Sequence, residues 1–250
     1  MENEYKLYPI GFGSGLNGDF RINSWYMKIG DRLYLFDCPY STVSYFASKE
    51  GKKILTGIKR VVVFISHLHE EICGGISNLS WLISRKYKKE IWVFVHTKIA
   101  MAFTNYLEIT QCDLVNITVT QGDYYQDEEV QVLCRPSQHN GITAFSFVVY
   151  GKYKFIEGDG ENWCIYYSGD NKNFMDEVMV ESFLKDPESK LIYHEITFNA
   201  NNDEHCYKDK IIKVIPKSLR KYITPINLDL KGDIKRCSSL GFNIPEEFIQ

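Results

Sequence analysis

The chain has 250 residues, 44% of them hydrophobic and 14% aromatic, which is enough to bury a full core, and we expect a single domain over residues 1–250. Its 29 basic and 32 acidic residues give a net charge of -3. Long nucleic acid is therefore not an expected partner, because a polyanion is held by clustered Lys and Arg side chains.

The first residues are acidic where a secretory signal is basic, and no apolar run reaches the about 18 residues that a membrane span needs. The seven cysteines are scattered and include no CxxC pair. This spacing argues against a disulfide framework and against a structural zinc knuckle. We therefore expect a cytoplasmic protein with reduced thiols and no membrane partner.

Apolar, β-branched and aromatic runs predict strands, and helical patterns fall between them. In chain order, the sequence predicts strands over 24–29 and 33–37, a helix over 41–49, a strand over 60–66, a helix over 76–88, a strand over 91–96, a helix over 98–107, strands over 115–120, 130–134, 144–150, 152–157 and 163–168, a helix over 173–183, a strand over 190–195, a helix over 207–219 and a strand over 221–224. This pattern favours an α/β fold of two mixed β-sheets packed face to face with helices outside, an αββα sandwich.

Two histidines stand one residue apart where the predicted strand 60–66 gives way to a turn, in the segment SHLHEEICGG. The rings of His67 and His69 can both aim a nitrogen at one point beyond the strand. His139 and Asp170 also follow predicted strands. Three imidazoles and one carboxylate suit a tetrahedral or five-coordinate Zn²⁺ ion. The sequence therefore predicts a metal site formed by residues at strand ends.

These residues resemble the HxHxDH signature of the metallo-β-lactamase superfamily. Further segments resemble its ribonuclease Z branch, namely 11–15, 21–24, 35–38, 193–198 and 203–205. The resemblance implies that His67, His69 and His139 are first-metal ligands and that Asp170 bridges two metals. It also implies that His205, oriented by Glu195, protonates the leaving group.

The chain departs from the family pattern at the second metal site. Glu71, Ile72 and Pro225 align with the Asp and His of HxHxDH and with a late histidine. Isoleucine and proline offer no donor atom, so the sequence predicts one tight metal, zinc with manganese as the alternative, rather than two. Glu71 remains open as a metal ligand, a catalytic base or a solvated carboxylate. Asn227, two residues beyond Pro225, could supply an amide oxygen.

Ribonuclease Z proteins hold tRNA with an arm inserted between the segments that match His139 and Asp170. Here strands 144–150 and 152–157 are predicted to form a hairpin through Gly151, which leaves no room for an arm. The resemblance is thus to armless relatives, which include phage and bacterial cyclic nucleotide phosphodiesterases of the anti-Pycsar type. It implies a small nucleotide or other phosphodiester substrate and a homodimer. Candidates for stacking a base are Trp25, Tyr40, Tyr124 and Tyr125.

Three functions follow from these patterns. The retained Glu195 and His205 favour a metal-dependent phosphodiesterase acting on a small cyclic nucleotide. The missing donors at Ile72 and Pro225 favour a catalytically degraded protein that binds a nucleotide or a protein partner without turnover. The third is a metallohydrolase of another bond, such as a lactone or a thioester, for which the segment around Glu195 would be unusual.

Overall fold

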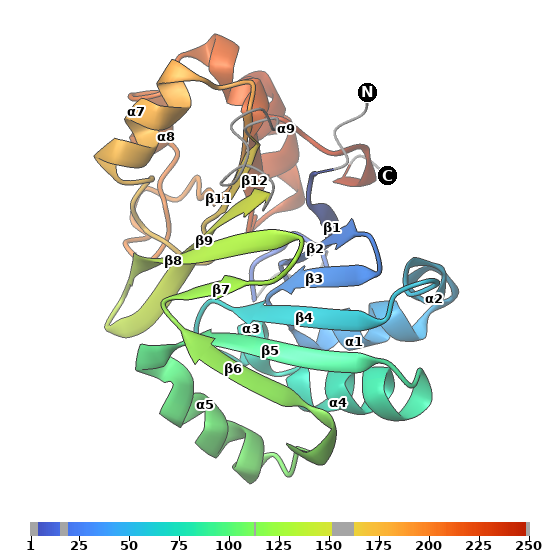
Figure 1. The fold of residues 1–250 in the computed structure, drawn as a ribbon. Coiled ribbons are helices and arrows are strands. Elements are labelled where there is room, and N and C mark those ends of the chain that lie inside the picture. The colour runs from blue at the N-terminus through green and yellow to red at the C-terminus, as the bar shows by residue number, and fades with distance from the viewer. Residues whose placement is uncertain (1–4, 16–19, 113, 152–162, 249–250) are drawn as a thin grey trace. The chain divides into compact units, whose positions relative to one another are not determined.

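The structure is a computed structural model, and it describes residues 5–15, 20–112, 114–151 and 163–248 (Figure 1). The chain divides into two compact units. The first comprises Met1–Phe12 and Arg21–Tyr125, and the second comprises Gly13–Phe20 and Gln126–Gln250. The expectation of a single domain over 1–250 stays a prediction. Among the described helices, none is long and apolar enough to cross a membrane.

The described part of the first unit is built on a six-stranded mixed sheet with the order β1-β2-β3-β4-β5-β6. Its strands are β1 (Tyr8–Gly11), β2 (Ser24–Ile29), β3 (Arg32–Phe36), β4 (Arg60–Ile65), β5 (Glu90–His96) and β6 (Thr118–Gly122). Strands β1 to β3 pair antiparallel, whereas β3 to β6 run parallel. Because parallel strands end at one edge of a sheet, Asp37, His67 and His96 come to the same edge.

The helices of this unit are α1 (Tyr40–Ala47), α2 (Lys49–Ile54), α3 (Glu70–Cys73), α4 (Ile76–Trp81) and α5 (Thr97–Ile109), with a π-helical turn at Leu82–Lys86 and a 3₁₀ turn at Leu114–Asn116. Helices α1, α4 and α5 lie against the sheet (Figure 1). The predicted helix 41–49 is two helices, because Ser48 has an extended backbone and its side chain caps α2 by accepting from Gly51 N. The predicted strand 115–120 begins only at Thr118.

The core of the first unit centres on β4, whose residues 61–65 are all fully buried. Phe64 packs against Phe36 at 5.3 Å between ring centroids, against Phe94 at 5.8 Å and against Tyr125 at 5.3 Å. Burying each such side chain contributes roughly 1.5–3 kcal/mol. A parallel strand covered on both faces reads as an unbroken apolar run, which is why β4 was predictable.

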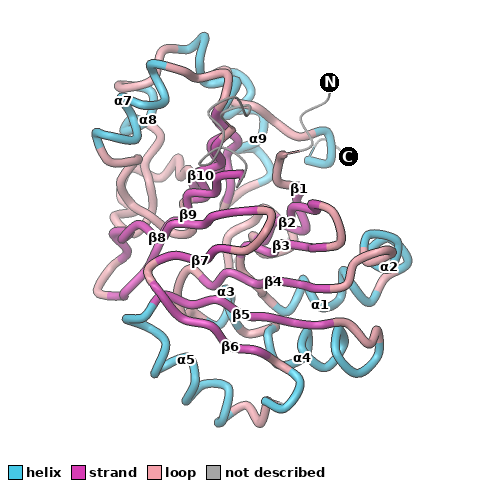
Figure 2. The backbone as a smooth tube through the Cα atoms, in the orientation of Figure 1, coloured by secondary structure: helices cyan, strands magenta, loops and turns pink. Residues whose placement is uncertain are grey.

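The second sheet has the order β12-β11-β10-β9-β8-β7 among the described residues. Strands β7, β8, β9 and β10 of this sheet are labelled in Figure 2. Its strands are β7 (Tyr124–Gln126), β8 (Val130–His139), β9 (Ile142–Gly151), β10 (Cys164–Tyr167), β11 (Lys190–Glu195) and β12 (Ile223–Ile226). Strands β8, β9 and β10 pair antiparallel, and β10 to β12 run parallel. The parallel strands bring Glu195, which ends β11, and Asp170 and Asn227, which follow β10 and β12, to one edge.

Strand β8 continues past its predicted end at Cys134 to His139. Pro136 is exposed and lies where the three-residue β7 does not reach, so its missing N–H breaks no ladder there. The turn between β8 and β9 contains Gly141 with a φ of 67°, a left-handed conformation that glycine adopts without strain. The predicted strand 152–157, and with it the predicted hairpin through Gly151, lies outside the described residues.

The second unit contains α7 (Glu177–Lys185), α8 (Asp209–Ile212) and α9 (Lys231–Ser239), with 3₁₀ turns at Lys217–Tyr222 and Glu246–Phe248. The predicted helix 173–183 begins only at Glu177, where the Asp176 side chain accepts from Met179 N at 2.9 Å. The predicted helix over 207–219 is a single short helix, since Pro216 cannot continue it. Helix α9 was not predicted.

Candidate metal centre

The loop after β4 holds the two histidines of the SHLHEEICGG segment. His67 Nε2 lies 3.1 Å from His69 Nδ1, and the ring centroids are 4.7 Å apart. Two nitrogens bound to Zn²⁺ at about 2.0–2.1 Å and a tetrahedral angle lie about 3.3 Å apart. The histidine pair therefore fits two neighbouring positions around one metal ion.

A chain of hydrogen bonds orients His67. Ser66 Oγ lies 3.0 Å from His67 Nδ1, and Ser66 N donates to Asp37 Oδ1 at 2.8 Å. Asp37 is fully buried and has a φ of 64°. Contacts of this kind fix the ring of a metal-binding histidine. Neither Ser66 nor Asp37 was predicted to act at the site. The position of Asp37 directly after β3, at the same sheet edge as His67, could have indicated its role.

Glu71, in α3, has its Oε1 3.5 Å from His69 Nδ1 and a side chain that is 40% exposed. Such a carboxylate can act as a ligand, a base or a solvated group, and the geometry is compatible with each. Its neighbour Ile72 is buried, and its carbonyl accepts from Cys38 N at 2.7 Å. Cys73 is also buried, and burial raises the pKa of its thiol to about 12. The side chains of Ile72 and Cys73 therefore point into the protein interior and anchor this loop.

Gly75, between α3 and α4, donates its N–H to Cys38 O at 2.8 Å. A Cβ at this position would clash with the carbonyl oxygens of Cys38 and Pro39. We expect Gly75→Ala to lower the free energy of unfolding by about 1–3 kcal/mol, the usual cost of overpacking, as measured by urea denaturation. The matched control is Gly232→Ala in α9, where a Cβ meets nothing within 4 Å and where a gain of about 0.4–1 kcal/mol is expected. Equal stability of the two variants would contradict this account of Gly75.

The second unit brings His139 and Asp170 together. His139 ends β8, Asp170 follows β10, and both side chains are buried. His139 Nε2 lies 3.9 Å from Asp170 Oδ2. A buried imidazole and carboxylate at this separation can serve as neighbouring ligands of one cation.

Glu195, which ends β11, is fully buried and accepts several hydrogen bonds. Its Oε2 lies 2.6 Å from His205 Nδ1, and its Oε1 accepts from Asn171 N at 2.6 Å. Asn227 Nδ2 donates to Glu195 Oε2 at 3.3 Å and to Asp170 Oδ1 at 3.1 Å. The predicted Glu195 and His205 pair is therefore in contact, and Asn227 presents its amide nitrogen, not its oxygen, to the two carboxylates.

The charge of His205 is set by these neighbours. Burial lowers the pKa of His205, but the hydrogen bond to Glu195 and the charge of that carboxylate outweigh burial and raise the pKa above the ordinary imidazole value. The charges of Asp170 and Asp229 raise the pKa further. His205 therefore carries a proton at neutral pH.

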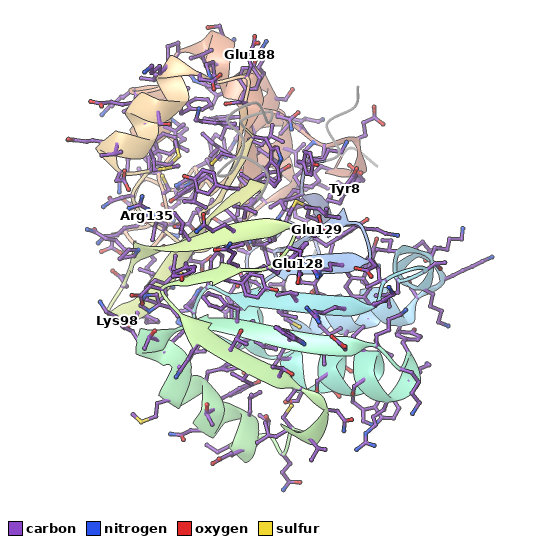
Figure 3. All side chains as sticks on the ribbon, viewed as in Figure 1. Tyr8, Lys98, Glu128, Glu129, Arg135 and Glu188 are labelled. Atoms are coloured by element: carbon purple, nitrogen blue, oxygen red, sulfur yellow. The ribbon has the colours of Figure 1, made fainter. Side chains whose placement is uncertain are left out.

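Two further histidines, His96 and His194, have capping and packing roles in the structure. His96 caps α5 by accepting from the backbone N–H of Lys98, which is labelled in Figure 3, at 3.1 Å. Its Nε2 lies 3.1 Å from Asp123 Oδ1. His194 is fully buried, donates from Nδ1 to Glu195 O at 2.8 Å and packs against Phe174, and burial lowers its pKa.

Of the four residues predicted to stack a base, two are buried and two are exposed. Trp25 and Tyr125 are buried in the core, with Trp25 Nε1 donating to Asn23 Oδ1 at 2.7 Å, so the prediction was wrong for these two. Alternating strand residues look alike in sequence whichever face they occupy. Tyr40 and Tyr124 are 64% and 57% exposed and remain candidates.

Comparison with solved structures identifies the fold class. The chain is similar to human tRNase Z, short form (ELAC1), at a TM-score of 0.67 and 18% identity over 97% of this chain and 96% of that one. It is similar to the metallo-β-lactamase fold protein YhfI from Bacillus subtilis at a TM-score of 0.65 and 14% identity, over 94% and 92% of the two chains. Zn²⁺-bound PqqB from Methylobacterium extorquens follows at 0.61 and 9% identity, over 96% and 97%. The predicted αββα metallo-β-lactamase fold is confirmed.

The sequence itself places the chain in a family within this class. Residues 5–231 match the family described as anti-Pycsar protein Apyc1. No curated protein matches the chain. Because the family match covers most of the chain, this protein belongs to the anti-Pycsar protein Apyc1 family. The predicted resemblance to anti-Pycsar-type members of the ribonuclease Z branch is thereby confirmed.

Proposed function

We propose that this protein is a metal-dependent phosphodiesterase that hydrolyses a small cyclic nucleotide. The observation that carries the proposal is the 2.6 Å contact of His205 Nδ1 with Glu195 Oε2, in a cluster where Asp170, Glu195 and His205 each offer an atom within 4.8 Å of the others. A carboxylate-held imidazole next to a candidate metal-binding carboxylate is an arrangement suited to general acid catalysis. Membership of the anti-Pycsar family supports a cyclic nucleotide as the substrate.

The donor types present, imidazole nitrogen and carboxylate oxygen, suit a divalent metal. We propose that His67, His69, His139 and Asp170 hold it, with Glu71 as a further ligand or as a base. Three imidazoles and one carboxylate favour zinc, with manganese as the alternative. When bound, such a metal lowers the pKa of a coordinated water and polarises a phosphoryl oxygen.

The protein's own residues supply the proton that the leaving group needs. When water attacks the phosphorus of a cyclic phosphodiester, one P–O ester bond breaks and the departing sugar oxygen must be protonated. His205 carries a proton at neutral pH, and its Nδ1 is engaged by Glu195, so Nε2 is the atom that delivers the proton. Glu195 is the positioning residue, because it fixes the ring and stabilises its charged form.

Several observations favour a small substrate over a nucleic acid chain. The net charge of -3 gives no excess of positive charge for a polyanion. The turn between β8 and β9, directly after His139, is short and contains Gly141, so this turn has no room for an inserted arm of the kind that holds tRNA. We further propose that the protein acts as a homodimer, as the family resemblance implies, and that it works in the cytoplasm.

Hydrolysis of a panel of cyclic mononucleotides, with bis(p-nitrophenyl) phosphate as a generic diester, tests the proposal. We expect turnover of at least one cyclic mononucleotide, and no turnover of matched lactone or thioester substrates. The second candidate is a binding protein without turnover, and it is favoured by the burial of Ile72 and Pro225, two apolar residues at aligned second-metal positions. Nucleotide binding without hydrolysis, measured by calorimetry, would support that candidate and contradict the phosphodiesterase.

A further inference from the structure

Asn227 makes two contacts that the reaction just described does not use. Its Nδ2 donates to Asp170 Oδ1 at 3.1 Å and to Glu195 Oε2 at 3.3 Å, and it is buried. Both acceptors are carboxylates, which can only accept when ionised, so the two amide hydrogens must face them. Asn227 thus links the candidate metal-binding carboxylate to the carboxylate that holds His205.

The backbone fixes Asn227 in this place. It follows β12 with a φ of 57°, a left-handed conformation that asparagine adopts more readily than other residues with a side chain. The next residue, Leu228, accepts from Ser14 N at 3.1 Å and forms a bridge with Gly13. The position of the amide is therefore set by the fold of the second unit.

Asp170, Glu195 and His205 would otherwise form a donor set for a cation, since their atoms lie within 4.8 Å of one another. Hydrogen-bond donors already occupy these oxygens. Asn227 Nδ2 donates to Asp170 Oδ1 and to Glu195 Oε2, and His205 Nδ1 contacts Glu195 Oε2 as well. A cation entering this cluster would have to displace these hydrogen bonds and would meet the positive ends of the N–H groups. Asp170 Oδ2, on the side of His139, is not the oxygen that Asn227 occupies.

We infer that Asn227 is a positioning residue that takes the place of a second metal. Its amide holds Asp170 and Glu195 together by hydrogen bonds, so that the centre holds one metal, on the Oδ2 side of Asp170. This inference rests on the proposed metal centre. Ile72 and Pro225 supply no donor for a second ion, and the Asp170 oxygen that remains for one is already paired with the Asn227 amide.

Zinc titration of the metal-stripped full chain, by calorimetry with elemental analysis of the dialysed protein, tests the inference. We expect the wild-type protein to bind one zinc per chain. Asn227→Asp replaces the donor by a third carboxylate and is expected to bind two. Asn227→Ala is expected to bind one zinc with an affinity weaker by about 10-fold or more, because Asp170 loses a hydrogen bond that helps to orient it. The control is Asn201→Asp, which adds the same charge at an exposed position of the same unit and is expected to match the wild type.

Wild-type protein that binds two zinc ions with similar affinity would overturn this inference and leave the proposed hydrolase standing. A single zinc in Asn227→Asp, together with an unchanged zinc affinity in Asn227→Ala, would also overturn the inference. Wild-type protein that binds no metal would overturn the metal centre and the inference together. A second zinc in Asn227→Asp, in a protein that shows no turnover, would support the role of Asn227 and contradict only the proposed activity.

Discussion

His67→Ala is expected to abolish tight metal binding and to lower hydrolysis by more than about 100-fold, which is the upper end of what losing an outer-shell partner of a metal ligand costs. His67 is fully buried, its Nε2 lies 3.1 Å from His69 Nδ1, and Ser66 engages its other nitrogen. Alanine removes the donor, and no neighbouring side chain of the loop replaces it at this position, since Ile72 and Cys73 pack inward. Metal content after dialysis and the turnover rate measure the two effects.

The control for His67→Ala is His96→Ala in the same unit. His96 ends the parallel strand β5, but it caps α5 rather than facing another imidazole. Its removal should cost about 0.5–2 kcal/mol of stability, as loss of an N-cap does, and leave the metal content unchanged. A His67→Ala protein that keeps the wild-type metal content would show that this histidine is not a ligand.

His205→Ala is expected to lower kcat by about 10²–10⁴-fold while the metal content stays at the wild-type level. The side chain supplies a proton and is not among the proposed ligands, so binding and catalysis should separate in this variant. Trp81→Ala, at an exposed aromatic of α4 to which no role in the site is assigned, is the control and should keep most of the activity. Full activity in His205→Ala would remove the general acid from the mechanism.

The pH profile gives a second test of the same pair. The pKa of His205 is raised by Glu195, so activity should persist above the ordinary imidazole pKa and fall as the pH rises through the raised value. Glu195→Gln keeps a hydrogen-bond acceptor but removes the negative charge. The alkaline limb should therefore move to lower pH in this variant, and an unmoved limb would mean that another group provides the proton.

The strands that position the site were predictable because they are buried on both faces. Residues 61–65 of β4 are apolar without interruption, β11 contains the shorter run 191–193, and both strands were predicted within one residue of their bounds. Short strands such as β1 and β7 were missed, since four or three residues carry too little periodicity to be recognised without their partners. Strand β8 runs past its predicted end and through Pro136, since a proline ends a strand only where a neighbour needs its N–H.

The parts of the site that could be predicted are those whose residues lie close together in the sequence. His67 and His69 are one residue apart, and the segment around Glu195 resembles a family motif, so both could be found from the sequence. Asn227 contacts Asp170 across 57 positions of the chain, and only its left-handed backbone turns the amide toward that carboxylate. The sequence suggested an amide oxygen at Asn227, whereas the structure presents the amide nitrogen, because nothing in a sequence specifies which atom of an amide faces a neighbour.

The most direct test of the central claim is to strip the protein of metal and follow hydrolysis of cyclic mononucleotides as Zn²⁺ or Mn²⁺ is added back. A metal-dependent phosphodiesterase predicts no turnover in the stripped protein and recovery of turnover that saturates with the added metal. Cyclic mononucleotides that stay intact at every metal concentration, although the protein binds the metal, would contradict the proposed phosphodiesterase and leave a binding protein on a metallo-β-lactamase fold.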